Sequence, residues 1–378
     1  MATTNFAALG LEEKIVWARE LWAAARNASF MMQFTGKGPN SMIQRITELT
    51  KSEKGARAII TLVTDLEGDG IMGDATLENN EEAIKAQDTV IIIDQLRNAN
   101  RLEGRMADQK SVVTFRETSR DVLAYWLGDR CDQLALLTLA GEEYSQNTNG
   151  SVRTVYPQGQ NFTDLDFSGD ANPPPTVNRY YNWTDTTQNL LAGNTATVVV
   201  ADKLSYAALV ELKAQAKTNY MRGIKGPGGT EYFHVFMHPK VMKDLKLDSD
   251  YLASLQNAGV RGNSNPIFSG ATVTVDGLIL HEHRHVYNTL GATSGVNKWG
   301  SSDNIEGAAV LFCGAQALGL ADIGLPYWDE DTFDYGNQHG ISVGKIFGLV
   351  KAQFTSIYDG ADTTALRDFG VIRMNVAI

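Results

Sequence analysis

The sequence has few of the features that mark secreted or membrane-spanning proteins. Only two cysteines, Cys131 and Cys313, occur among 378 residues, and they lie far apart in apolar stretches. We therefore expect buried thiols in a reducing compartment and no disulfide bond. The N-terminus lacks a basic segment followed by an apolar core, so no secretion signal is expected. No apolar run reaches the roughly 18 residues that a membrane-spanning helix needs.

Signatures of catalysis are also scarce. The G-x-S-x-G motif of serine hydrolases, the Rossmann fingerprint and internal repeats are all absent from the sequence. The glycine-lysine pair in "TGKGPN", at Gly36 and Lys37, has neither the spacing of a phosphate-binding loop nor a strand before it. We interpret it as an ordinary loop, and no cofactor is expected.

Composition describes a folded, loop-rich protein, and the order of elements given below assigns it to the α+β class. Hydrophobic residues make up 43% of the chain, which also contains 35 glycines. The formal net charge is −11, from 33 basic and 44 acidic residues. Such an acidic chain is poorly suited to bind nucleic acid tightly through its phosphates.

Two helices stand out in the first half of the chain. Residues 11–28 have apolar residues at helical spacing and predict an amphipathic N-terminal arm. Residues 114–141 predict a helix of about seven turns. Thr114 and Glu117 form a capping-box pattern at its start, and Gly141 is a suitable C-terminal stop.

Residues 46–100 predict a long projecting hairpin, with short β-like runs on either side of a glycine-rich, acidic centre. Within it, "DLEGDG" resembles the beginning of an EF-hand calcium loop, with Asp65, Glu67 and Asp69 as candidate ligands. Position twelve of that loop is Thr76, where an EF-hand has a bidentate glutamate. A cluster of turns is the better interpretation, and a calcium-binding adhesion module is the alternative.

The stretch "HEHRH" matches the zinc-peptidase pattern H-E-x-x-H through His281, Glu282 and His285. That pattern requires a helix, whereas "ATVTVDGLILHEHRHVY" reads as a β-hairpin turning at Asp276-Gly277. On a strand the two histidines would be about 13 Å apart, too far to share one zinc ion. A zinc hydrolase therefore remains only an alternative.

A weaker metal site remains possible on the same strand face. His281 and His283 would be about 6.6 Å apart there, and a third ligand would have to come from His234 or His238. A partly exposed polar strand face is the favoured interpretation.

The rest of the chain divides by composition. Residues 145–199 are polar and rich in Asn, Thr, Gly and Pro, as in a long insertion. Residues 200–325 alternate helical and strand patterns and predict one compact α+β module. Residues 326–378 contain two long strand patterns, which we expect to pair beneath the long helix.

Three separated blocks carry a family resemblance: "ELTKSEKGARAIITLVTDLEGDGIMGDATLENNEEAI", "NPIFSGATVTVDGLILHEHR" and "DYGNQHGISVGKIFGLVKAQF". Together with the order of modules, they resemble the major capsid proteins of tailed bacteriophages with the Hong Kong 97-type fold, in the branch found in large podoviruses and their relatives. The resemblance covers most of residues 10–378 and is weakest over 145–200.

The resemblance implies an architecture. Residues 1–45 would be the N-terminal arm and 46–100 the extended loop. Residues 101–199 would be the peripheral domain, containing the spine helix 114–141. Residues 200–325 would form the axial domain, and 326–378 would return to the peripheral domain.

The resemblance also implies a structural, non-enzymatic function. The protein would assemble as hexamers and pentamers into an icosahedral shell enclosing double-stranded DNA, in the virion capsid and after assembly in the host bacterial cytoplasm. Scaffold, portal and decoration proteins are candidate partners. Six charged residues are candidates for intersubunit contacts: Lys51, Glu53, Lys54, Arg57, Glu282 and Arg284.

Some members of the wider fold crosslink lysine to asparagine. Neither Lys51 nor Lys54 has the apolar surroundings that would make a lysine a nucleophile, so no crosslink is expected.

Overall fold

The computed structural model describes most of the chain. The described residues are 19–21, 24–25, 29–47, 55, 57–63, 69–83, 86–110, 114–154, 160–171, 173–257, 273–355 and 366–378. Of the predicted N-terminal helix, residues 19–21 and 24–25 are helical, and Leu21 and Ala25 are buried.

The long helix α3, Phe115–Ala140, is the central element of the fold. Its buried residues follow an apolar stripe that widens until the last two turns are buried on every side. Gly141 ends the helix in the left-handed conformation (φ 69°) and donates its N–H to the carbonyls of Leu137 and Thr138. Thr114 is the N-cap residue as predicted, but its side chain makes no capping hydrogen bond.

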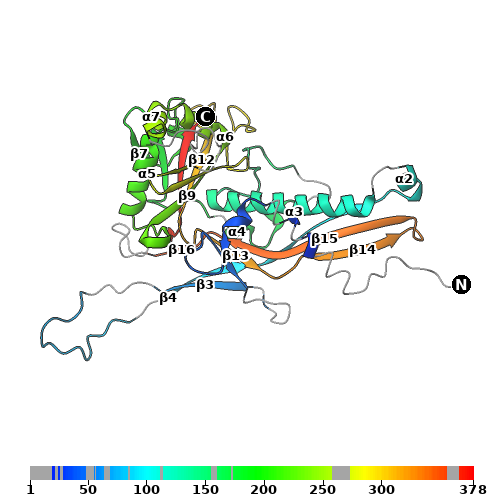
Figure 1. Cartoon of the computed structure of the whole chain (residues 1–378), viewed down its shortest axis with the longest axis horizontal. Helices are drawn as coiled ribbons and strands as arrows, with labels where there is room; N and C mark the ends of the chain where they lie inside the picture. Colours follow the sequence, from blue (N-terminus) through cyan, green and yellow to red (C-terminus); the bar gives the residue numbers. More distant parts are fainter. Residues whose placement is uncertain are drawn as a thin grey trace.

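A six-stranded sheet lies along α3, and its longest strand is β15, Gln338–Val350. Figure 1 shows α3 running beside β15 and β14, with α2 at the far end. The path order is β1-β2-β13-β15-β14, and β5 pairs with the other edge of β15. Its other strands are β1 (Thr35–Gly36), β2 (Ile43–Ile46), β5 (Asp94–Arg101), β13 (Leu318–Asp322) and β14 (Tyr327–Phe333).

An eight-stranded sheet forms the second part of the molecule, in the order β10-β11-β9-β12-β18-β6-β7, with β8 paired to β9. Its strands are β6 (Tyr180–Thr184), β7 (Asn189–Ala192), β8 (Ile224–Lys225), β9 (Glu231–Met237), β10 (Val273–Val275), β11 (Leu278–Glu282), β12 (Gly307–Cys313) and β18 (Val371–Ala377). Its helices are α5 (Tyr206–Thr218), α6 (Pro239–Leu247) and α7 (Ser249–Asn257).

Strand β12 is buried on both faces, which explains its uninterrupted apolar sequence. Val310 and Phe312 pack in the core with α5 and α6, whereas Leu311 and Cys313 face the core shared with α3 and the first sheet. The second sheet therefore separates two hydrophobic cores, one on each of its faces.

Strands β3 (Arg57–Val63) and β4 (Ala86–Ile92) form the predicted projecting hairpin. Ala58, Ile60 and Ile91 bury one face of its base against the first sheet. Residues 69–83 beyond it are exposed and extend away from the body (Figure 1). No helix among the described residues is long and apolar enough to cross a membrane.

Short elements complete the chain. They are α2 (Arg105–Lys110), α4 (Ser168–Ala171), η1 (Met31–Phe34), η2 (Phe162–Asp164), η3 (Thr195–Thr197), η4 (Pro227–Gly229), β16 (Gln353–Phe354) and β17 (Arg367–Asp368).

Three expectations about strands need correction. The extended-loop range 46–100 includes β5, which pairs with β15 in the first sheet. The last strand, β18, pairs with β12 and β6 in the second sheet, not beneath α3 beside β15. The polar stretch 145–199 contributes β6 and β7 to the same second sheet. These pairings join residues far apart in sequence, which local patterns do not specify.

Candidate functional site

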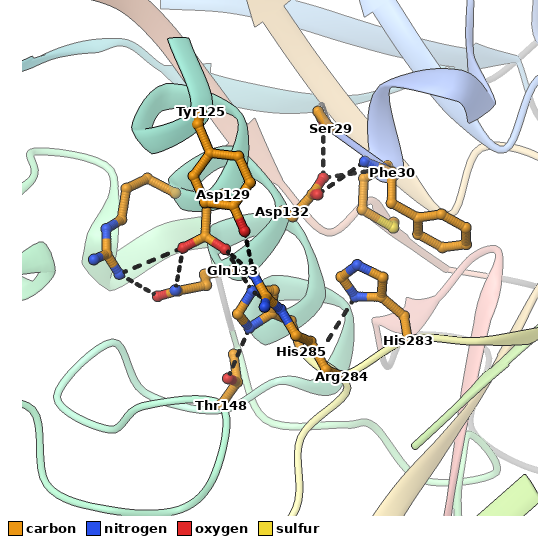
Figure 2. Close-up of polar contacts among 12 residues, drawn as sticks. Ser29, Phe30, Tyr125, Asp129, Asp132, Gln133, Thr148, His283, Arg284 and His285 are labelled. Carbon is orange, nitrogen blue, oxygen red and sulfur yellow. Dashed lines mark hydrogen bonds and ion pairs between the residues drawn. The ribbon is translucent and has the colours of Figure 1, made fainter. Parts of the chain in front are cut away.

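Polar contacts join three separate parts of the fold at a junction of α3, the segment Ser29–Phe34 and the end of β11. Asp129 and Asp132 lie one turn apart on α3 and project towards different partners (Figure 2). Residues three apart share a helix face, so one stretch of α3 binds two neighbouring segments.

Asp132 binds the start of the Ser29–Phe34 segment. Its carboxylate accepts hydrogen bonds from the Ser29 hydroxyl (2.6 Å), the Phe30 N–H (2.8 Å) and the Met31 N–H (2.9 Å). A 3-10 helix begins at Met31, so the carboxylate satisfies N–H groups that have no partner within the helix. Burial raises the pKa of Asp132, and the Ser29 hydrogen bond opposes that rise.

Asp129 binds the turn after β11. Its carboxylate accepts hydrogen bonds from His285 Nε2 (2.7 Å), Arg284 (2.9 Å) and the Gln133 amide (2.9 Å). The hydrogen bond from His285 is the main cause that lowers the pKa of Asp129 to about 2. Arg284 also donates to the hydroxyl of Tyr125 (2.8 Å), another residue of α3.

The histidines lie beside this junction, but the strand prediction was only half right. The hairpin turns at Asp276-Gly277 with positive φ at both residues, as expected for that pair. Strand β11 ends at Glu282, however, and residues 283–286 form a turn. Hydrogen bonds to Asp129 and Thr148 hold His285 in that turn.

This geometry argues against the zinc site. His281 forms a hydrogen bond with His234 (Nε2 to Nδ1, 2.9 Å), whereas His285 contacts Asp129 and Thr148. The two predicted ligands therefore have separate partners. Glu282 is exposed and lies 3.5 Å from Lys246. Within the described part of the chain, no three His, Cys, Asp or Glu side chains are placed to hold a metal ion, and this includes the His281–His283–His234 set.

The calcium hypothesis falls mainly outside the described residues, which include neither Asp65 nor Glu67. Asp69 is described and exposed.

The six intersubunit candidates divide in the same way. Lys51, Glu53 and Lys54 lie outside the described residues, and Arg57 is exposed at the start of β3. Glu282 and Arg284 have partners within the chain, Lys246 and Asp129. Their role between subunits stays a prediction.

Sequence reasoning missed Asp129 and Asp132. The available signal was a pair of carboxylates three residues apart near the apolar stripe of a long helix, where a charged residue needs a partner.

Sequence reasoning also missed two buried lysines. Lys345 lies 2.5 Å from Asp322, and Lys351 lies 3.2 Å from Asp368.

Comparisons with known proteins identify the fold. A family model described as phage capsid protein matches residues 5–378. The major capsid protein of Pseudomonas phage KPP25 is 57% identical over 376 residues, which are 99% of this chain and 97% of that protein.

Solved structures agree with this assignment. The capsid of Ralstonia phage GP4 is similar with a TM-score of 0.73 and 26% identity, over 92% of this chain and 90% of that one. The capsid asymmetric unit of cyanophage Pam1 has a TM-score of 0.70 and 17% identity, over 100% and 96% of the two chains. The fold is thus the Hong Kong 97-type capsid fold. The chain belongs to the phage capsid protein family, and it forms the shell of a bacteriophage as its major capsid protein.

Proposed function

We propose that the chain assembles as hexamers and pentamers into an icosahedral shell that encloses double-stranded DNA, and that it catalyses no reaction. The observation that carries the proposal is the exposed end of the β3–β4 hairpin. Ile71, Met72 and Leu77 expose 39%, 77% and 62% of their surface there. Apolar side chains on a projecting loop gain stability only when another molecule covers them.

The occupant we propose is the neighbouring copy of this chain. The hairpin projects away from the body (Figure 1). In the proposed contact, its tip binds a different surface on the neighbouring copy. Such a heterologous contact repeats from copy to copy and closes into a ring. Residues 69–83 contain acidic but no basic residues, so the receiving surface would be apolar with a basic rim.

The six charged candidates are proposed as additional contacts between subunits. Lys51, Glu53, Lys54 and Arg57 combine both signs of charge in the sequence that leads into β3. The side chains of Glu282 and Arg284 remain 53% and 61% exposed in their pairs within the chain. Each can therefore bind a neighbour in place of, or in addition to, its present partner.

The same proposal covers DNA, partners and place of assembly. A net charge of −11 disfavours tight binding of the packaged DNA to the shell wall. Both described cysteines are free thiols and buried, which suits assembly in the host bacterial cytoplasm. Scaffold, portal and decoration proteins remain proposed partners.

Electron microscopy and sedimentation of the purified chain, alone and with its candidate scaffold, test the proposal. Closed shells, tubes or rings are expected. The double variant Met72→Asp and Leu77→Asp should give soluble subunits that do not assemble. The matched control, Met72→Leu and Leu77→Met, should assemble. Normal shells from the aspartate variant would show that the tip is not the contact.

Two further experiments address the DNA and the lysines. Assembled shells should not retain free DNA at low salt, and retention would contradict the role given to the acidic charge. Denaturing gels of particles should show single chains, because Lys51 and Lys54 lack the apolar sequence surroundings that would activate a lysine for crosslinking. A ladder of covalent oligomers would contradict this.

A further inference from the structure

Four of the chain's six histidines lie around the junction described above. His285 binds Asp129, whereas His234 and His281 bond to each other and His283 Nδ1 accepts the backbone N–H of His285. His234 lies on β9, His281 on β11 and His283 just after it. We refer to these three residues as the histidine platform.

The Ser29–Phe34 segment covers this platform with two phenylalanine rings. Phe30 stacks on His283, with ring centres 4.7 Å apart and planes 10° from parallel. Phe34 contacts His234 and His281 edge-on, with ring centres 5.0 Å away in each case. Beneath Phe34, His234 Nδ1 lies 2.9 Å from His281 Nε2.

The His234–His281 hydrogen bond imposes a limit on protonation. One nitrogen must donate its proton and the other must offer its lone pair. When both rings are protonated, both nitrogens carry hydrogen and the bond becomes a repulsion. Attraction between an imidazolium and a neighbouring phenyl face does not restore it.

We propose that the histidine platform is an acid-sensitive latch, which holds the Ser29–Phe34 segment at neutral pH and releases it in mild acid. The neighbouring charges favour this direction. Arg284 and His285 add positive charge beside His283, and Asp129 is already bound to both. On the α6 side, Lys240 and His238 lie near β9, and neither is acidic.

Two carboxylates on the elements around the platform have other partners. Asp132 of α3 accepts three hydrogen bonds from Ser29, Phe30 and Met31. Glu282 alternates with His281 along β11 and lies near Lys246. Neither is therefore free to stabilise a charged platform.

Burial lowers the pKa of His234, His281 and His283 to about 4. The positive charge of His234 adds to this effect at His281, and those of His285 and Arg284 add to it at His283, where Asp129 opposes it. Once the segment leaves, water reaches the rings and each pKa returns towards the ordinary 6.5. The released state then binds more protons between pH 6.5 and pH 4. At pH 5, each histidine with these values weakens docking roughly 20-fold relative to pH 7.

Cys131 offers a direct readout of release. It is buried and lines a small apolar cavity together with Met31, Met32 and Thr35. Departure of the segment would expose its thiol. Cys313 is fully buried in the central strand β12, opposite His234 of β9, and reports unfolding of the second sheet.

The experiment measures labelling of the full-length chain by a pyridyl disulfide, which still reacts in mild acid, with each labelled cysteine identified by peptide mass spectrometry. From pH 7.5 to pH 5, the ratio of Cys131 to Cys313 labelling should rise at least tenfold. An unchanged ratio would overturn the latch, as would equal acceleration at both cysteines.

Variants assign the effect to the platform. His234→Asn with His281→Gln can keep an amide hydrogen bond and removes two of the three titrating rings, so the rise should shrink at least threefold, and it should disappear when His283→Gln is added. The control His339→Gln changes an exposed histidine on β15 and should retain the full rise. Asp132→Asn should also retain an acid-dependent rise. If this variant keeps the wild-type ratio at pH 7.5 and shows no rise at pH 5, Asp132 is the acid sensor and the proposal is wrong. A full rise in the histidine double variant would also overturn the proposal.

If the double variant does not fold, the single variant His283→Gln in the same assay replaces it. The rise should then shrink at least threefold, and a rise as large as that of the wild type would count against the platform.

Discussion

The carboxylate of Asp132 accepts a hydrogen bond from the hydroxyl of Ser29 at 2.6 Å, across 103 residues of sequence. The same carboxylate accepts the backbone N–H groups of Phe30 and Met31. One side chain of the long helix thus fixes where the N-terminal segment meets the body of the protein. The first prediction concerns this contact.

Replacing Asp132 with alanine should lower the free energy of unfolding by about 3 kcal/mol, because buried donors lose a charged acceptor. Urea unfolding followed by circular dichroism measures this. Asp121→Ala is the matched control on the same helix, where the exposed Asp121 side chain pairs with Arg120 at the surface. It should cost less than about 1 kcal/mol. Equal losses in the two variants would refute the structural role of Asp132.

The carboxyl of Asp129 should titrate at about pH 2, because the hydrogen bond from His285 favours its charged form. The folded pKa lies below the ordinary value of 3.8, so the stabilisation is complete above pH 3.8 and is lost as the pH falls towards 2. It amounts to roughly 1 kcal/mol, given partial screening by water. Carbon-13 NMR of labelled aspartate gives the midpoint, and His285→Gln should move it upwards. A midpoint unaffected by that change would contradict the assignment.

The two buried lysines should respond differently to replacement by methionine. Lys351→Met leaves Asp368 buried without a cation and should cost about 3–5 kcal/mol. Lys345→Met should cost less, because Arg45 still lies 2.6 Å from Asp322. Urea midpoints of the two variants test the order. The reverse order would mean that Arg45 does not compensate Asp322.

Gly141→Ala should destabilise the protein by more than 1 kcal/mol, since the new methyl group meets a strained backbone and close neighbours. Its φ is +69°, and the added carbon would lie 2.8 Å from both the Pro173 carbonyl oxygen and Pro175. Gly169→Ala, in α4 with no heavy atom within 4 Å of the added carbon, is the control. The control should be neutral or slightly stabilising. A tolerated Gly141→Ala would show that the helix end is adaptable.

Local patterns identified most elements of this fold. The spacing of apolar residues and the final glycine located α3 to within a residue at each end. The Asp276-Gly277 pair located the β10–β11 turn. Each of these signals acts within a few residues, through backbone conformation or helix periodicity, so a single sequence suffices to read it.

Other features depended on contacts between distant segments. The pattern of "HEHRH" predicted a strand up to Tyr287. Instead, His285 donates a hydrogen bond to Asp129 and bonds with Thr148, and these contacts hold a turn there. The position of β18 between β12 and β6 likewise depends on which strands the rest of the fold leaves available for pairing. No local propensity contains that information, because pairing partners are chosen by the whole fold.

The sequence by itself determined the class of the protein, the long helix, the projecting hairpin and, through three separated blocks, the family resemblance. Only the tertiary structure decided what Asp129, Asp132 and the histidines do. The energy of a buried charge or imidazole depends on the groups that surround it, and here those groups come from segments about 50 to 150 residues apart.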